Sequence, residues 1–245
     1  MKIFERQKAA AKRIAVALDG MDFDQASATI ELLAPLGVGF KAGLEIIMLP
    51  DGAADRLIKK IHSLGGWCFF DTKLDDIPPT VENAAANIAK KNVRFFNVHA
   101  SAGIPAVEAA VKARGSCGVL VVTVLTSIDK ESCIRIFGDE PTPKVLQFAR
   151  EAKAAGAQGI VCSALELEAL FEAGILDNDF IAVTPGIRLP DAPPDDQKRT
   201  RTPREAMKKG ASILVVGRPI TKAKDPVGAT ATFISEVVLA EGEKK

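Results

Sequence analysis

Short apolar runs alternate with longer amphipathic segments along the chain. Most of the runs are continuously rich in Val, Ile, Leu and Phe, which is typical of β-strands buried on both faces of a parallel sheet. They predict eight strands, at residues 13–19, 38–44, 67–74, 95–100, 119–126, 159–163, 180–185 and 213–219.

Between these runs, apolar residues recur at helical spacing, and Gly or Pro marks many of the joints. The expected helices cover residues 24–36, 53–64, 82–91, 104–114, 143–155, 164–173, 203–209 and 226–240, with an extra helix at about 2–11. Eight strand–helix units predict an α/β fold, a single (β/α)8 TIM barrel domain over residues 1–245.

A doubly wound open sheet is the alternative architecture. It would normally carry a G-x-G-x-x-G turn after its first strand, but residues 19–24 read D-G-M-D-F-D. The barrel is therefore favoured over a dinucleotide-binding fold.

Composition limits the classes of partner. The net charge is +1, so nothing global favours nucleic acid or an anionic membrane, and any anion site must be local. The basic run at 198–204 has no interleaved aromatic residues and is interpreted as a solvated loop. The four cysteines are widely spaced and the charged N-terminus lacks the apolar core of a signal peptide, which predicts a cytoplasmic protein.

The most unusual stretch is D-T-K-L-D-D at residues 71–76, directly after an apolar run. Period-2 alternation places Asp71, Lys73 and Asp75 on one strand face, and Lys41 of the second strand joins them if its register matches. A buried structural ion network explains any one of these charges equally well. Because polar residues end several strands of one barrel face, a functional pocket is the better interpretation of the whole set.

A second signal is V-G-R-P at residues 216–219, after the eighth strand. Loops after strands 7 and 8 of such barrels commonly bind phosphate, and the fork of Arg218 suits phosphate oxygens. The long polar loop at 186–203 follows strand 7. With two histidines and no paired spacing, no transition-metal site is expected, although carboxylates holding Mg²⁺ stay open.

The motifs together resemble the orotidine 5′-phosphate decarboxylase family. The D-x-K-x-x-D-I-P-x-T string at 71–80 is similar to its central motif, with Asp75 and Pro79 standing where His and Asn are common. The resemblance continues through A-L-D (17–19), F-K-A-G-L-E (40–45), N-V-H-A (97–100), T-V-L-T-S (123–127), T-P-G-I-R (184–188) and V-G-R-P-I (216–220). It covers almost the whole chain.

The resemblance implies catalytic roles for four charged residues. Lys73 would protonate C6 of the pyrimidine, and Asp71 would lie beside the departing carboxylate and orient Lys73. Lys41 would bind ribose and complete an alternating charge array. Asp76 would reach across a homodimer interface into the partner's site.

The resemblance also implies a set of substrate contacts. Asp19 would bind ribose, Thr80 would cross the dimer interface, and the loop at 186–203 would close over the substrate. The implied substrate-binding residues are Asp19, Lys41, Asp71, Thr80, Thr126, Ser127, Pro185, Arg188, Gln197, Gly217 and Arg218.

The implied activity is conversion of orotidine 5′-phosphate to UMP in de novo pyrimidine biosynthesis, by a carbon–carbon lyase without cofactor or metal. Two alternatives remain. One is a magnesium-dependent keto-sugar-phosphate decarboxylase or aldolase of the same barrel superfamily, and the other is a non-catalytic nucleotide-binding barrel.

Overall fold

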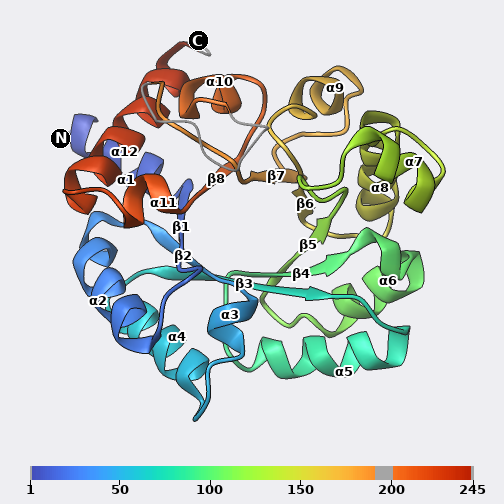
Figure 1. Cartoon of the computed structure of the whole chain (residues 1–245), viewed down its shortest axis with the longest axis horizontal. Coiled ribbons are helices and arrows are strands. Elements are labelled where there is room, and N and C mark those ends of the chain that lie inside the picture. Colours follow the sequence, from blue (N-terminus) through green and yellow to red (C-terminus); the bar gives the residue numbers. More distant parts are fainter. Residues whose placement is uncertain (1, 191–200, 244–245) are drawn as a thin grey trace.

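A computed structural model describes residues 2–190 and 201–243, and within these ranges eight parallel strands form a closed barrel (Figure 1). The strands follow one another in chain order, and β8 pairs back to β1. Their bounds are β1 Ile14–Ala17, β2 Gly39–Ala42, β3 Trp67–Leu74, β4 Phe95–His99, β5 Gly118–Val122, β6 Gly159–Val161, β7 Ile181–Thr184 and β8 Ile213–Val216. The predicted (β/α)8 TIM barrel is confirmed.

Helices surround the barrel on its outside (Figure 1). Those at the expected places are α1 Lys2–Ala11, α2 Phe23–Leu33, α4 Ala53–Ser63, α5 Pro78–Ala89, α6 Ile104–Ala113, α8 Pro141–Ala154, α9 Leu167–Glu172, α10 Pro203–Lys208 and α12 Pro226–Glu243. The sequence did not predict α3 Leu44–Ile47, α7 Lys130–Phe137 or α11 Arg218–Thr221, nor the 3₁₀ turns η1 Ala34–Leu36 and η2 Ala100–Ala102 as separate elements. No described helix has the length and apolar character needed to cross a membrane.

The strands separate two layers of apolar side chains. Val16 and Leu18 belong to the large layer between strands and helices, whereas Ala15 and Ala17 belong to a small cluster made of strand residues alone. Successive side chains of a strand point to opposite faces, so the second cluster fills the barrel interior. The packed interior closes the floor beneath the carboxyl ends of the strands.

The boundaries of two elements, the start of α5 and the end of β5, differ from the prediction. Helix α5 begins at Pro78, four residues before its predicted start, because a proline at the first helical position sacrifices no intrahelical hydrogen bond. Strand β5 ends at Val122, and Asp129 caps α7 by accepting a 2.8 Å hydrogen bond from the Ser132 amide. Residues 123–127 therefore lie in a loop beyond the strand.

Candidate active site

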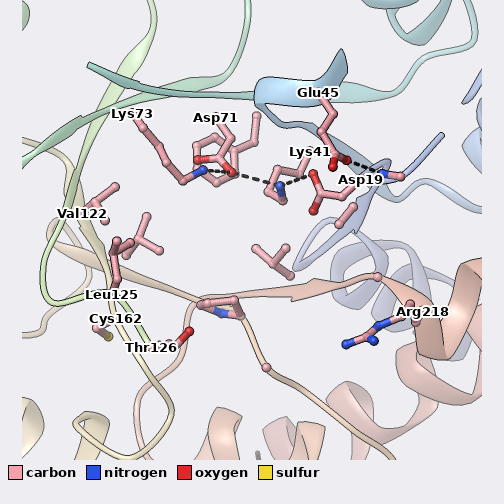
Figure 2. A pocket seen from close by; sticks show the side chains of 18 of the residues that line it. Asp19, Lys41, Glu45, Asp71, Lys73, Val122, Leu125, Thr126, Cys162 and Arg218 are labelled. Atoms are coloured by element: carbon pink, nitrogen blue, oxygen red, sulfur yellow. Dashed lines mark hydrogen bonds and ion pairs between the residues drawn. The ribbon is translucent and has the colours of Figure 1, made fainter. Parts of the chain in front are cut away.

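A pocket of about 540 Å³ lies at the carboxyl ends of the strands (Figure 2). This volume is typical of sites for small organic ligands. Its polar wall includes Asp19, Lys41, Glu45, Asp71, Lys73, Thr126, Arg188 and Arg218, and its apolar lining includes Phe69, Val122, Leu125 and Val161.

Four charged side chains form an unbroken array along one wall of the pocket (Figure 2). The Lys73 ammonium lies 2.7 Å from Oδ2 of Asp71. The same carboxylate oxygen accepts a 2.9 Å hydrogen bond from Lys41. Lys41 also donates to Oδ1 of Asp19 at 2.8 Å. The charges thus alternate in the order Lys73, Asp71, Lys41, Asp19.

Barrel register brings the members of this array together. Lys41 of β2 pairs with Ala17 on one side and with Phe69 of β3 on the other, and both neighbours belong to the interior cluster. Lys41 therefore points into the barrel, and Asp71 lies two residues beyond Phe69 on the same face. Lys41 and Asp71 are both buried, at 9% and 6% exposure.

Burial and charge act in opposite directions on the two buried groups. Burial alone would raise the pKa of Asp71, but the ammonium groups of Lys41 and Lys73 outweigh it and hold that pKa below its usual value. Burial would lower the pKa of Lys41, but Asp71 and Asp19 outweigh it and raise that pKa. Both side chains therefore stay ionised around neutral pH.

A backbone bulge in β3 positions Lys73. Phe70 pairs with Phe96 and Leu74 pairs with Val98, so the three residues from Asp71 to Lys73 lie opposite the single residue Asn97. Lys73 itself has φ of 48°, a left-handed conformation that is uncommon for a residue with a side chain.

The same bulge also affects the position of Asp75, which differs from the prediction. Asp71 and Lys73 share the pocket, as period-2 alternation predicted, but Asp75 does not line it. Asp75 is exposed and accepts a 3.1 Å hydrogen bond from Ser101. Nearby, burial lowers the pKa of His99 although Asp75 opposes the shift, which favours a neutral imidazole. His99 does not line the pocket either.

The ends of β7 and β8 supply another part of the lining. Pro185 and Arg188 line the pocket after β7, and Gly217 and Arg218 line it after β8. Figure 2 places Arg218 and Thr126 across the cavity from the charged array. The predicted residue Gln197 lies outside the described residues.

Three predicted residues do not line this pocket. Asp76, Thr80 and Ser127 are exposed in the single chain. Asp76 accepts a 2.7 Å hydrogen bond from the Ile77 amide, and the Ile77 side chain is 65% exposed. The pocket of one chain therefore forms without the side chains of Asp76 and Thr80.

Sequence reasoning assigned no role to three residues at this site, although it noted Asn97 as a polar residue near the end of its strand. Glu45 lines the pocket and accepts a hydrogen bond from the Gly20 amide. Asn97 is fully buried and bonds to Asp71. Cys162 is also among the lining residues, although it packs in the layer between strands and helices, and burial raises the pKa of its thiol. Glu45 and Asn97 stand inside quoted motifs, F-K-A-G-L-E and N-V-H-A, but nothing local indicates their partners.

Asp19 and Asp71 in the pocket face lysines and not one another. Within residues 2–190 and 201–243, no group of three or more His, Cys, Asp or Glu side chains is arranged to hold a metal. Asp19 and Asp71 instead direct oxygens at the ammonium group of Lys41.

The closed parallel barrel and its charged mouth define the class, a (β/α)8 protein with its candidate site at the carboxyl ends of the strands. Within this class the family is also clear. The model of the orotidine 5′-phosphate decarboxylase / HUMPS family matches residues 12–233, and the chain belongs to this family.

Individual relatives agree with this assignment. The chain is 40% identical over 227 residues to an orotidine 5′-phosphate decarboxylase of Chromohalobacter salexigens, covering 91% of this chain and 94% of the relative. It is 38% identical over 240 residues to one of Moorella thermoacetica, covering 94% and 93%. These relatives are carbon–carbon lyases by name, which confirms the expected enzyme class.

Solved structures agree as well. The crystal structure of an orotidine 5′-phosphate decarboxylase from Lactobacillus acidophilus matches with a TM-score of 0.79 and 35% identity, covering 92% of this chain and 99% of that one. An uncharacterised conserved protein from Geobacillus kaustophilus matches with a TM-score of 0.74 and 29% identity, covering 91% and 99%.

Proposed function

We propose that the protein decarboxylates orotidine 5′-phosphate to UMP, a step of de novo pyrimidine biosynthesis, without a metal or cofactor. The observation that carries the proposal is the alternating array of Lys73, Asp71, Lys41 and Asp19 in one pocket of a chain from this family. The curated relatives named for the same reaction support it.

The reaction explains why such an array is useful. Loss of CO₂ leaves an electron pair at C6 in the plane of the pyrimidine ring, where no carbonyl group accepts it by resonance. A fixed ammonium group in a closed pocket stabilises that charge without reorganising. The proposal assigns this role to Lys73, which then transfers its proton to C6 and leaves UMP.

Asp71 and Lys41 hold Lys73 in position. The Asp71 carboxylate lies 2.7 Å from the Lys73 ammonium, and the two lysines keep the pKa of Asp71 below its usual value. In the proposed complex Asp71 lies beside the substrate carboxylate, so departure of CO₂ relieves a repulsion between like charges.

Binding energy comes from the parts of the substrate that do not react. We assign the ribose hydroxyls to Asp19 and Lys41, and the pyrimidine edge to Thr126 and Ser127, although Ser127 does not line the pocket of the isolated chain. We assign the phosphate region to Pro185, Arg188, Gln197, Gly217 and Arg218. The predicted closure of the loop at 186–203 over the nucleotide concerns mainly residues 191–200, which lie outside the described residues.

We propose that the active unit is a homodimer. Asp76 and Thr80 are exposed and face no part of their own pocket, which fits a role in the site of the other subunit. Ile77 lies between them in the chain, and burying its exposed side chain at an interface would remove apolar surface from water. A cytoplasmic location stays a prediction.

The decisive experiment is to follow the absorbance of orotidine 5′-phosphate after adding purified protein, with and without EDTA. Turnover that is insensitive to EDTA is the expected result. Activity on sugar phosphates that EDTA abolishes would favour the magnesium-dependent alternative, and nucleotide binding without turnover would favour the non-catalytic one.

A further inference from the structure

Asn97 is a buried polar residue opposite the bulge of β3. It lies in the middle of β4, fully buried, opposite the three bulged residues of β3. Among the described residues it is one of the few polar residues without any exposed surface, and it does not line the pocket. A buried amide group is costly unless it is hydrogen-bonded, so its partners indicate what it does.

Asn97 contacts all three residues of the bulge. Its Nδ2 donates a 2.6 Å hydrogen bond to Oδ1 of Asp71, and its Oδ1 accepts a 2.7 Å hydrogen bond from the Lys73 amide. The Thr72 hydroxyl donates to the Asn97 backbone carbonyl at 2.9 Å. The orientation of the amide is fixed by chemistry, because only oxygen accepts from a backbone N–H and only nitrogen donates to a carboxylate.

These bonds tie both members of the central ion pair to one rigid strand. Oδ2 of Asp71 receives the two lysines, so the Asn97 bond to Oδ1 sets the rotation of the carboxylate. The bond to the Lys73 amide occupies the donor of the residue with positive φ, which the bulge removes from the regular ladder. Without the amide side chain, both anchors are lost together.

We infer that Asn97 is a positioning residue for the proposed reaction, holding the Asp71 carboxylate and the left-handed Lys73 backbone in the geometry that aims the Lys73 ammonium into the pocket. The inference rests on the proposed function. Asn97 does not contact the substrate space, so its loss affects the chemical step more than binding.

Two variants test this role. In Asn97→Leu, which removes both hydrogen bonds at similar size, kcat is expected to fall on the order of 100-fold, because a small misplacement of a reacting group costs about that much. KM is expected to stay within about threefold, because the lost interaction matters in the transition state. Thr230→Val, which removes the hydrogen bond that the fully buried Thr230 donates within α12, is the control and should leave kcat unchanged.

Asn97→Asp should change the pH dependence of kcat, an effect that loss of stability alone does not produce. The new carboxylate would face Asp71 across a hydrogen-bond distance, so the pair would hold one proton up to an unusually high pH. While that proton is present, an O–H···O bond replaces the N–H···O bond at the native net charge. The kcat ratio of variant to wild type should therefore rise as pH falls.

Other charged or titratable groups lie near residues 71 and 97, and the kcat ratio of variant to wild type is used because both proteins contain them. Lys41 and Lys73 face Asp71 from β2 and β3, Asp19 lies beyond Lys41, and His99 is two residues along β4. Each of these groups is present in both proteins, so the ratio compares two enzymes that differ at residue 97 alone.

The outcomes are distinguishable. A wild-type protein that does not turn over orotidine 5′-phosphate overturns the proposed function. An active wild type combined with near-normal kcat in folded Asn97→Leu, or with a flat pH ratio in Asn97→Asp, overturns the positioning role alone. Folding of each variant is checked by its thermal transition and by UMP binding.

Discussion

The Lys73 ammonium lies 2.7 Å from Oδ2 of Asp71, and both side chains come from one bulged segment of β3. Asp71 is almost completely buried, whereas the Lys73 side chain is 30% exposed and reaches the open pocket. A buried anion thus holds a cation that a ligand can approach.

Replacing Lys73 tests the proposed proton donor. Lys73→Ala is expected to lower kcat by at least about 1,000-fold, because it removes both charge stabilisation and the proton source. UMP binding, followed by calorimetry, should remain measurable. Lys112→Ala is the matched control, since Lys112 lies in an exposed ion pair with Glu82 outside the pocket, and the activity of this variant should be normal. Comparable kcat values in the two variants would contradict the role of Lys73.

Replacing Asp71 tests the electrostatics of the array. Asp71→Asn leaves two lysines facing a neutral amide and is expected to lower the free energy of unfolding by about 3–5 kcal/mol at pH 7. The folded pKa of Asp71 is depressed, so its contribution is present above the ordinary value of 3.8 and is lost as pH falls through the folded value. The difference in the free energy of unfolding between wild type and variant should therefore become smaller below about pH 3.8, as measured by urea titrations.

The control for that experiment is Glu82→Gln, which removes an exposed ion pair worth about 0–1 kcal/mol. An Asp71→Asn variant as stable as this control would show that the buried pair contributes little.

Gly43 tests the packing of the array without removing a charge. A Cβ at Gly43 would lie 3.0 Å from Nζ of Lys41 and closer still to Oδ1 of Asp19. Gly43→Ala should displace that ion pair at a cost of about 1–3 kcal/mol in stability, with reduced kcat/KM. Gly242→Ala, where nothing lies within 4 Å, should change neither thermal stability nor kinetics. A fully active Gly43→Ala enzyme would argue against a rigid array.

Mixing variants tests the shared site of the proposed homodimer. Lys73→Ala and Asp76→Ala should each be nearly inactive alone. Random reassociation after co-refolding gives hybrid dimers with one intact site, so about a quarter of wild-type activity should return. If Asp76 acts in its own subunit, each hybrid contains two damaged sites and activity stays at the background of the separate variants.

Arg218 tests the proposed phosphate subsite. Arg218→Ala should raise KM for orotidine 5′-phosphate about 10- to 100-fold, the value of a hydrogen bond to a charged group. With orotidine, which lacks the phosphate, the same substitution should change kcat/KM little. An equal loss on both substrates would place Arg218 in a structural role instead.

The sequence predicted the barrel because its strands are buried on both faces, and burial leaves a continuous apolar pattern. It also indicated Asp71, Lys73 and Lys41. Charged residues are rare inside buried strands, and those near the carboxyl ends of barrel strands belong to the face where the site lies. The start of α5 was missed because Pro78 is compatible with either a loop or a first helical turn.

Only the tertiary structure decided which charges meet. The register of β1, β2 and β3 brings Asp19, Lys41 and Asp71 into contact, and the bulge opposite Asn97 separates Lys73 from Asp75. Register and bulges depend on pairing between strands that are distant in sequence, so periodicity within one strand does not encode them. The residue types come from the sequence, whereas the alternating order of their charges comes from the register of three neighbouring strands and the bulge in β3.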